Sequence, residues 1–375
     1  MNYEIPVYFC TDEKTELMPS LQTAANQFSY ASLTRSERIR LWSGYGNYYG
    51  ISLDAVQLGS KYRFVPEEIK KACLQLKAGQ EKGVRTESLE AEILRNILPP
   101  VATKGRIEPY HSGCTLEELV LPPETKEKVL EICAHVWYSH KVYDEWNMES
   151  KFAYGKAVPV LLSGPPGTGK TMTARVISNM LKIPLYHINL SQLVDKYIGE
   201  TAKHLEEIFS NAERSNIILF FDEADAIFGK RSEVTDAKDR YANTEVSYIL
   251  QRMESYDGIV LLATNYKGNI DSAFMRRMKY LVNFQLPGEE ERLAIWKGCI
   301  PKECPLEDID FEYLAGQFEF SGSSIKNAVL TAMFLAAKEG SRVGMKHMVR
   351  GVKNEYRKNG KMPFPSDFGE YGFLA

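Results

Sequence analysis

Uninterrupted apolar runs recur in the second half of the chain, and stretches of helix length that mix apolar and polar residues separate them. The five runs are VPVLLS (158–163), PLYHINL (184–190), NIILFF (216–221), GIVLLAT (258–264) and YLVNFQL (280–286). Runs without period-two alternation predict strands that are buried on both faces, as in a parallel sheet covered by helices. The pattern therefore predicts an α/β core with a five-stranded parallel sheet, which we assign to 101–287.

After Pro287 the apolar pattern changes to a helical period. Several helix-length segments follow, and along the last of them an apolar stripe with helical spacing consists of Met345, Met348, Val349, Val352 and Tyr356. We predict a small helical lid over 288–361, followed by a C-terminal tail of 362–375.

Residues 1–100 read as a separate, mainly helical module with a helix around 66–77 and a polar linker that ends at Pro99 and Pro100. One internal echo links this module to the lid. YRFVPEEIKKA (62–72) and FEFSGSSIKNA (318–328) share Phe, Ile, Lys and Ala at identical spacing. Two interpretations stay open: amphipathic helices that converged, or the remnant of a second lid whose α/β core has been lost. A client-binding role is a further expectation for 1–100.

Composition narrows the class of protein. The chain has 375 residues, 44% hydrophobic and 25% charged, with a net charge of −3, which suits a globular protein and gives no overall attraction to nucleic acid or to an anionic membrane. Its six cysteines are scattered without a C-x-x-C pair, and no apolar run reaches 18 residues. We therefore expect a cytoplasmic protein with no membrane contact and no zinc site.

A phosphate-binding motif follows the first strand. GPPGTGKT (164–171) matches G-x-x-x-x-G-K-[ST] between a predicted strand and a predicted helix. Backbone N–H groups of such a loop cradle phosphate oxygens, Lys170 reaches the β- and γ-phosphates, and Thr171 ligates Mg²⁺. We therefore predict ATP and Mg²⁺ as cofactors. The predicted nucleotide contacts are Gly164, Pro165, Pro166, Gly167, Thr168, Gly169, Lys170, Thr171 and Met172.

Acidic and amide groups follow two later strands. In IILFFDEADAIF (217–228), Asp222 is placed to hold Mg²⁺ and Glu223 to orient and polarise the attacking water. Asn265 ends the next strand, in LLATN (261–265). In a sheet ordered 5-1-4-3-2 this amide lies beside the phosphate site, where it can hold the water against the γ-phosphate.

These motifs resemble those of the AAA ATPases, over about 115–361. The stretch 220–254, together with AFMRR (273–277), looks most like the AAA ATPases encoded with bacterial extracellular contractile injection systems. The resemblance implies a P-loop NTPase core with a helical lid and a homo-oligomeric ring, a hexamer, that places ATP between subunits.

The resemblance also implies an arginine supplied by the neighbouring subunit. The family's finger lies five residues after the Asp of an I-D-x-A motif, which in NIDSAFMRRMKY (269–280) makes it Arg276. A second arginine usually stands three residues later, where this chain has Lys279, so Arg277 is an alternative. In FSGSSIK (320–326), Lys326 corresponds to a sensor 2 cation, although many relatives of the katanin and spastin type lack one.

KYIGET (196–201) resembles the family's pore loop 1. On that reading Tyr197 projects into the ring's channel, Ile198 supports it, and Lys196 and Gly199 complete the loop, so that the ring grips an extended polypeptide. The alternative is that Tyr197 packs on its own helix.

The predicted function is ATP hydrolysis coupled to remodelling, unfolding, or assembly and disassembly of a protein client, with a contractile injection system component as one candidate client. A nucleotide-gated binding scaffold is the alternative. A nucleic-acid helicase, suggested by DEAD (222–225), fits less well, because only one P-loop is present.

Overall fold

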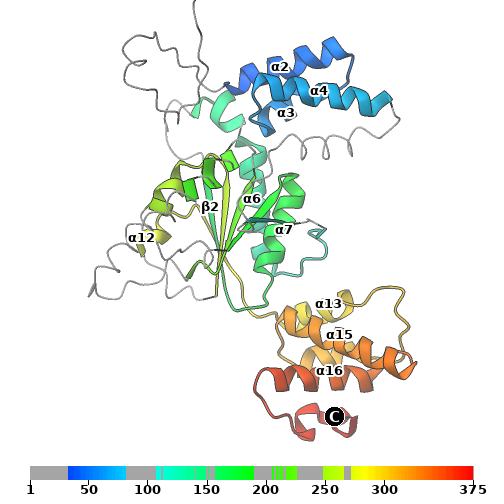
Figure 1. Ribbon diagram of the computed structural model, residues 1–375. Coiled ribbons are helices and arrows are strands. Elements are labelled where there is room, and N and C mark those ends of the chain that lie inside the picture. The colour runs from blue at the N-terminus through cyan, green and yellow to red at the C-terminus, as the bar shows by residue number, and fades with distance from the viewer. Residues whose placement is uncertain are drawn as a thin grey trace, which may run out of the picture.

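The computed structural model places a helical unit, an α/β body and a helical lid one after another (Figure 1). The pore-loop residues 196–199 and Asp271 lie outside the residues that it describes. The described ranges are 33–81, 107–110, 113–139, 141–148, 151, 157–189, 205–206, 208–210, 212–213, 217–225, 248–265 and 272–374. Within these ranges, none of the helices combines the length and the hydrophobicity that a bilayer span requires.

The α/β body contains one sheet in the order β1-β3-β4-β5-β2-β6. Its strands are β1 (Ile107–Tyr110), β2 (Val158–Ser163), β3 (Leu185–Asn189), β4 (Ile218–Asp222), β5 (Ile259–Thr264) and β6 (Tyr280–Asn283). Strands β2 to β6 pair in parallel, and in the numbering of the five predicted runs their order is 5-1-4-3-2, so that prediction is confirmed. The expectation of five strands was incomplete, because β1 adds a sixth, antiparallel strand beside β3.

The strands are buried because hydrophobic clusters cover both faces of the sheet. In β2, Val160 and Leu162 pack with α6 (Pro123–Trp137) and α7 (Lys170–Leu181), whereas Leu161 packs on the opposite face with the helical residues 248–255. A π-helical turn, η1 (Lys141–Glu145), follows α6, and the short α12 (Ser272–Met275) precedes β6. Alternate side chains thus enter two separate cores, which explains the uninterrupted apolar runs.

The lid consists of α13 (Glu289–Gly298), α14 (Phe311–Gln317), α15 (Gly322–Glu339) and α16 (Met345–Lys358). The predicted stripe of α16 enters the lid core, where Met348, Val349 and Val352 are fully buried. Helices α15 and α16 approach closely, since a Cβ built at Gly351 would lie 2.2 Å from the carbonyl oxygen of Ala328. The segment predicted as a C-terminal tail forms the 3₁₀ helix η4 (Pro365–Leu374) and buries Phe368 in the same core.

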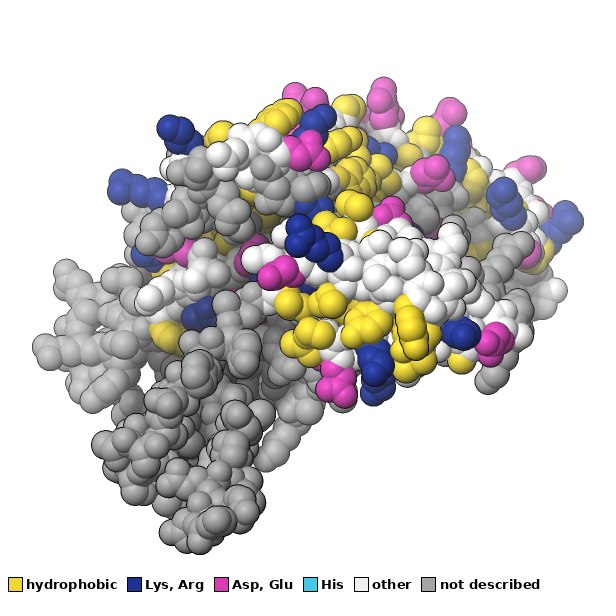
Figure 2. Space-filling model, turned by 90° about the horizontal axis from the view of Figure 1, so that it is seen from above, with side chains coloured by type: hydrophobic (Ala, Val, Ile, Leu, Met, Phe, Trp, Pro, Cys, Tyr) yellow, Lys and Arg dark blue, Asp and Glu magenta, His cyan; other side chains and the backbone are white. Residues whose placement is uncertain are grey.

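The N-terminal helical unit comprises α2 (Arg35–Tyr49), α3 (Ala55–Lys61) and α4 (Pro66–Glu81). These helices pack around the fully buried Trp42, and the helix predicted around 66–77 is four residues longer at its C-terminal end. Figure 2 shows the unit from above, with charged side chains scattered among hydrophobic ones. The buried cluster around Trp42 gives the unit a hydrophobic core of its own.

Candidate nucleotide site

The loop between β2 and α7 adopts a conformation that requires glycine. Gly164, Gly167 and Gly169 have φ angles of 153°, 76° and 101°, which residues with a Cβ rarely adopt. Space is also restricted, because a Cβ at Gly164 would lie 2.2 Å from the carbonyl oxygen of Phe284, and one at Gly167 would lie 2.0 Å from Oγ of Ser323. The loop can therefore turn its backbone toward a ligand at the N-terminus of α7.

Lys170 is the first residue of α7 and is 7% exposed. Its Nζ donates to the carbonyl oxygens of Gly164 at 2.7 Å and Pro165 at 2.9 Å, and to Oδ1 of Asn265 at 2.9 Å. Burial lowers the pKa of the Lys170 ammonium, and the carboxylate of Asp222 opposes that shift. The lysine and the amide that the sequence assigned to one site are thus in direct contact.

The predicted acidic pair ends β4. Oδ1 of Asp222 accepts from the backbone N–H of Glu223 at 2.9 Å, and Glu223 is exposed with a φ of 53°. A left-handed conformation at a residue with a side chain is strained, and such strain concentrates at functional sites. A third acid, Asp225, accepts from Oγ1 of Thr264 at 2.9 Å and so links the end of β4 to the end of β5. The sequence interpretation gave Asp225 no role, although its place in DEAD was a usable signal.

The three loops meet at one edge of the sheet, because parallel strands end together. The backbone N–H of Gly164 donates to the carbonyl oxygen of Thr264 at 3.2 Å, and Ser163 pairs with Thr264 in the register of β2 and β5. The P-loop, Asn265 and the Asp222–Glu223 pair therefore share the carboxyl edge, where ligands bind in open α/β sheets.

This donor set fits ATP with Mg²⁺. The Gly-rich loop and the positive end of α7 suit phosphate oxygens, and Lys170 supplies a cation. Thr171, in the first turn of α7, and Asp222 offer a hydroxyl and a carboxylate, the oxygen ligands that Mg²⁺ prefers.

The lid contacts the P-loop through the start of α15. The backbone N–H of Ser323 donates to the carbonyl oxygen of Gly167 at 3.2 Å, a contact that the sequence interpretation did not name. Lys326 is exposed one turn further on. Burial raises the pKa of the Cys299 thiol, and the nearby charge of Lys326 opposes that shift. A sensor 2 role for Lys326 stays a prediction.

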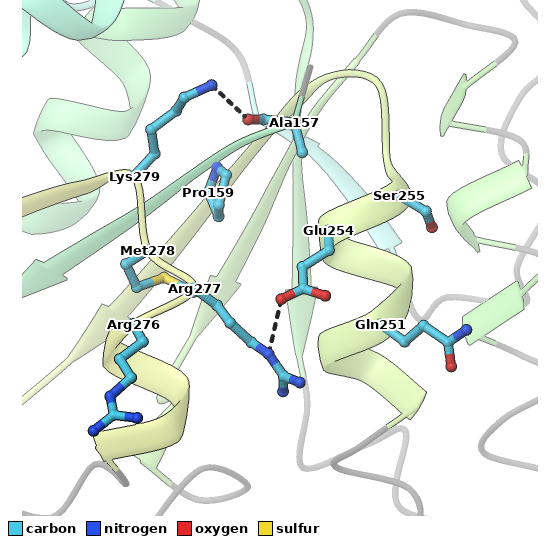
Figure 3. Close-up of a pocket in the computed structure, with 9 residues that line it drawn as sticks. All are labelled: Ala157, Pro159, Gln251, Glu254, Ser255, Arg276, Arg277, Met278 and Lys279. Carbon is cyan, nitrogen blue, oxygen red and sulfur yellow. Dashed lines mark hydrogen bonds and ion pairs between the residues drawn. The ribbon is translucent and has the colours of Figure 1, made fainter. Parts of the chain in front are cut away.

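The basic residues that precede β6 line a groove of about 600 Å³ (Figure 3). Nε of Arg277 lies 2.8 Å from Oε1 of Glu254, so this arginine is engaged within the chain. Nζ of Lys279 lies 3.4 Å from the carbonyl oxygen of Ala157 and 3.4 Å from Nε2 of His135. Burial, together with the charge of Lys279, lowers the pKa of His135.

Arg276 differs from its two basic neighbours. Figure 3 shows its side chain pointing away from the Arg277–Glu254 pair, and it forms no ion pair with another residue in the described part of the chain. Arg276 is exposed. Of the three candidates, Arg276 is therefore the one whose side chain has no partner among the described residues, whereas Arg277 and Lys279 both have one.

Comparisons with known proteins agree with this geometry. Residues 160–286 match the family model described as "ATPase family associated with various cellular activities (AAA)". Similar proteins include a proteasome-activating nucleotidase of Aeropyrum pernix, 36% identical over 203 residues, which are 52% of this chain and 50% of the relative. The 26S proteasome subunit RPT4 of Saccharomyces cerevisiae is 35% identical over 48% of this chain and 43% of its own length. A proteasome-activating nucleotidase of Archaeoglobus fulgidus is 33% identical over 54% of each chain.

The chain spans about half the length of the curated relatives that it matches. The matched residues contain the P-loop, the acidic pair, Asn265 and Arg276 on a sheet with the predicted strand order. Residues 160–286 of this chain are therefore an AAA ATPase domain with a P-loop NTPase fold.

Proposed function

We propose that this chain hydrolyses ATP as a member of a ring and uses the energy to remodel a protein client. One observation supports the proposal most directly. Lys170, the Asp222–Glu223 pair and Asn265 lie at one edge of the sheet, and Lys170 is hydrogen bonded to Asn265. A binding site alone would not need a carboxylate and an amide beside the phosphate loop, whereas hydrolysis needs a positioned water.

Each residue has one role in this proposal. Lys170 and the P-loop backbone bind the phosphates, while Thr171 and Asp222 hold Mg²⁺. Bound ATP with Mg²⁺ supplies the phosphoanhydride bond that is cleaved and the cation that offsets its charge. Glu223 orients and deprotonates water, and Asn265 holds that water in line with the γ-phosphate.

The position of Arg276 supports assembly into a ring. An exposed guanidinium without an ion pair in the described part of its own chain suits a neighbour's nucleotide, where it stabilises the charge that develops during transfer. The relatives named above are two proteasome-activating nucleotidases and a subunit of the 26S proteasome. A homohexamer is the assembly that we propose for this chain.

The proposed client is a protein. The names of the relatives favour a protein client over nucleic acid, and KYIGE, outside the described residues, is the segment that would grip it. The three relatives give no support to the narrower link with contractile injection systems, which stays a prediction together with the cytoplasmic location. A pull-down with a substrate-trapping variant addresses the client directly.

The decisive experiment uses Glu223→Gln. This variant keeps Asp222 and should bind ATP with Mg²⁺ at wild-type affinity, yet hydrolyse it at less than about one hundredth of the wild-type rate, because the base is gone. Binding is measured with a fluorescent ATP analogue and turnover by phosphate release. Turnover at the wild-type rate would remove Glu223 from its proposed role. A wild-type chain that binds ATP without hydrolysing it would favour the nucleotide-gated scaffold.

A further inference from the structure

The N-terminal unit repeats the first three helices of the lid. Helices α2, α3 and α4 correspond in order to α13, α14 and α15, and the short middle helix has seven residues in each. We propose that residues 33–81 are a second, shortened copy of the lid fold. The copy has lost the residues that face the P-loop and is fastened to the opposite end of the sheet by Arg63 and Asp257.

The two middle helices begin with the same cap. Asp54 has φ −84° and ψ 90°, and its side chain accepts from the backbone N–H of Gln57. Asp310 has φ −85° and ψ 90°, and its side chain accepts from the backbone N–H of Tyr313. Aspartate is a common N-cap residue, but φ and ψ angles that agree this closely before two helices of equal length rarely arise by chance.

The middle helices also end alike, on a pair of buried aromatic side chains. The rings of Tyr62 and Phe64 lie 5.2 Å apart with 25° between their planes, and those of Phe318 and Phe320 lie 6.0 Å apart with 30° between theirs. All four side chains are at most 6% exposed. The aromatic pair therefore turns the chain into the third helix in the same way in both units.

One arginine fixes the first helix to the second in each unit. Nε of Arg38 donates to the carbonyl oxygen of Gly59 at 3.0 Å, and Nε of Arg292 donates to that of Ala315 at 2.7 Å. In both arginines Nη1 donates to the carbonyl oxygen five residues earlier, at 2.6 Å and 2.9 Å respectively. Amphipathic helices that converged have no reason to share this four-atom arrangement.

The residues around these arginines match as well. ERIRLWSG (37–44) and ERLAIWKG (291–298) share Glu, Arg, Trp and Gly at the same spacing, with Ile or Leu at two further positions. Trp42 and Trp296 are both fully buried, and both indole N–H groups lack a hydrogen-bond partner within the described ranges. The third helices align without a gap at the buried pairs Ile69/Ile325, Ala72/Ala328, Cys73/Val329 and Leu76/Ala332.

The copy differs from the lid where the lid meets the P-loop. In the lid the backbone N–H of Ser323 bonds to Gly167, and a Cβ at Gly322 would lie 3.3 Å from the carbonyl oxygen of Gly167. The aligned residues of the copy are Pro66 and Glu67. A proline ring does not fit such an approach, and a carboxylate repels phosphate, so the copy has kept its fold and lost its nucleotide face.

The copy contacts the α/β body at a different place from the lid. The guanidinium of Arg63 donates to the backbone carbonyl oxygen of Asp257 at 2.9 Å and forms an ion pair with the Asp257 carboxylate. Asp257 lies just before β5, at the opposite end of that strand from Asn265. The aligned residue of the lid is Glu319, of opposite charge. The same fold thus closes the P-loop end as the lid and binds the strand-start end as the copy (Figure 1).

Zero-length cross-linking of the full chain tests the anchor. Carbodiimide joins amines to carboxylates in contact, so Arg63→Lys should yield a peptide that links positions 63 and 257, and adding Asp257→Asn should abolish it. Arg277→Lys is the matched control, since Arg277 contacts Glu254 at 2.8 Å. Cross-linking of the control without any 63–257 product would overturn the anchor.

Hydrogen exchange tests the shared arrangement. Arg38→Gln should speed amide exchange in α3 at least tenfold and leave α14 within twofold of wild type, while Arg292→Gln should do the reverse. If either variant fails to fold, Arg38→Lys and Arg292→Lys keep the charge and stem while losing the second donor. A loosened α14 in the lid variant, with α3 unchanged in the matching variant, would overturn the equivalence of the units.

Discussion

Nζ of Lys170 lies 2.9 Å from Oδ1 of Asn265, so the P-loop lysine and the amide after β5 are hydrogen bonded directly. The contact joins two loops that are 95 residues apart in the chain. It also orients the Asn265 amide, because Oδ1 accepts from the lysine and the NH₂ group is the donor that can face a ligand.

Substitutions of Lys170 and of Asn265 should therefore differ in effect, one on ATP affinity and the other on turnover. Lys170→Ala removes the cation that faces the β- and γ-phosphates, and charge-assisted hydrogen bonds of about 1.5–3 kcal/mol each predict a loss of ATP affinity of at least tenfold. Asn265→Ala should keep affinity within about threefold and lower turnover. Isothermal titration and phosphate release measure both. Affinity for ATP within about threefold of wild type in Lys170→Ala would contradict the assignment of the P-loop.

Arg276 and Arg277 stand side by side but should not be equivalent. Arg276→Ala should leave ATP binding unchanged and lower turnover in the assembled ring by about 10³–10⁵, the range known for arginine fingers. Arg277→Ala breaks an exposed ion pair with Glu254 and should change turnover less than tenfold. Mixing Arg276→Ala with Lys170→Ala subunits should restore some activity. Mixed rings verified by mass that remain inactive would argue against a shared site.

Much of the site was predictable because it depends on topology. The predicted strand order 5-1-4-3-2 makes β2 and β5 neighbours, and this brings Asn265, at the end of β5, to the P-loop at the end of β2. β1 was missed because IEPY contains a proline and no apolar run. The partners of Arg277 and Lys279 could not be predicted from the sequence either. Each partner lies on a helix that is distant in the chain, Glu254 in 248–255 and His135 in α6, and its position depends on how that helix packs.

The origin of the sequence match between the N-terminal module and the lid could not be determined from the sequence either. Matching apolar positions could not separate a copy from convergent amphipathic helices, because that pattern is common to both. The hydrogen bond from Nε of Arg38 to a carbonyl oxygen 21 residues away distinguishes the two interpretations, and no local sequence pattern encodes it.

The close approach of α15 and α16 predicts a stability effect. Gly351→Ala would place a Cβ 2.2 Å from the carbonyl oxygen of Ala328, and because backbone cannot yield cheaply, we expect the lid to lose about 1–3 kcal/mol of stability. Gly298→Ala is the control, since its Cβ would meet nothing within 4 Å. Denaturant unfolding compares the two variants. Equal midpoints for both would show that α16 shifts at no cost.

A carboxylate at the end of α15 predicts pH dependence in the lid. Hydrogen bonds from Lys346 and His347 lower the pKa of Glu339 from 4.5 to about 2, and Arg350 contacts its other oxygen at 2.9 Å. Because the folded-state pKa is depressed, this stabilisation is complete above about pH 4.5 and is lost as the pH falls toward 2.

Glu339→Gln should therefore lower the denaturant midpoint of the lid at pH 7 and converge with wild type as the pH falls toward 2. Glu290→Gln, at an exposed position of α13, is the control and should track wild type throughout. A difference between Glu339→Gln and wild type that stays constant from pH 7 to pH 2.5 would contradict the linkage.

The last prediction separates a machine that threads protein from a passive scaffold. Tyr197 lies outside the described residues, so its role rests on the resemblance of KYIGET to a pore loop. Tyr197→Ala leaves Lys170, Glu223 and Asn265 untouched, so basal ATP hydrolysis should stay within a few-fold of wild type. Traction should fail, because each aromatic contact with the client contributes about 1 kcal/mol and every subunit loses its own at once. The assay follows unfolding of a fluorescent domain with an unstructured tail, beside ATP turnover. Wild-type unfolding by Tyr197→Ala would show that the client is gripped elsewhere, and a wild-type chain that turns over ATP without unfolding the domain would point away from threading altogether.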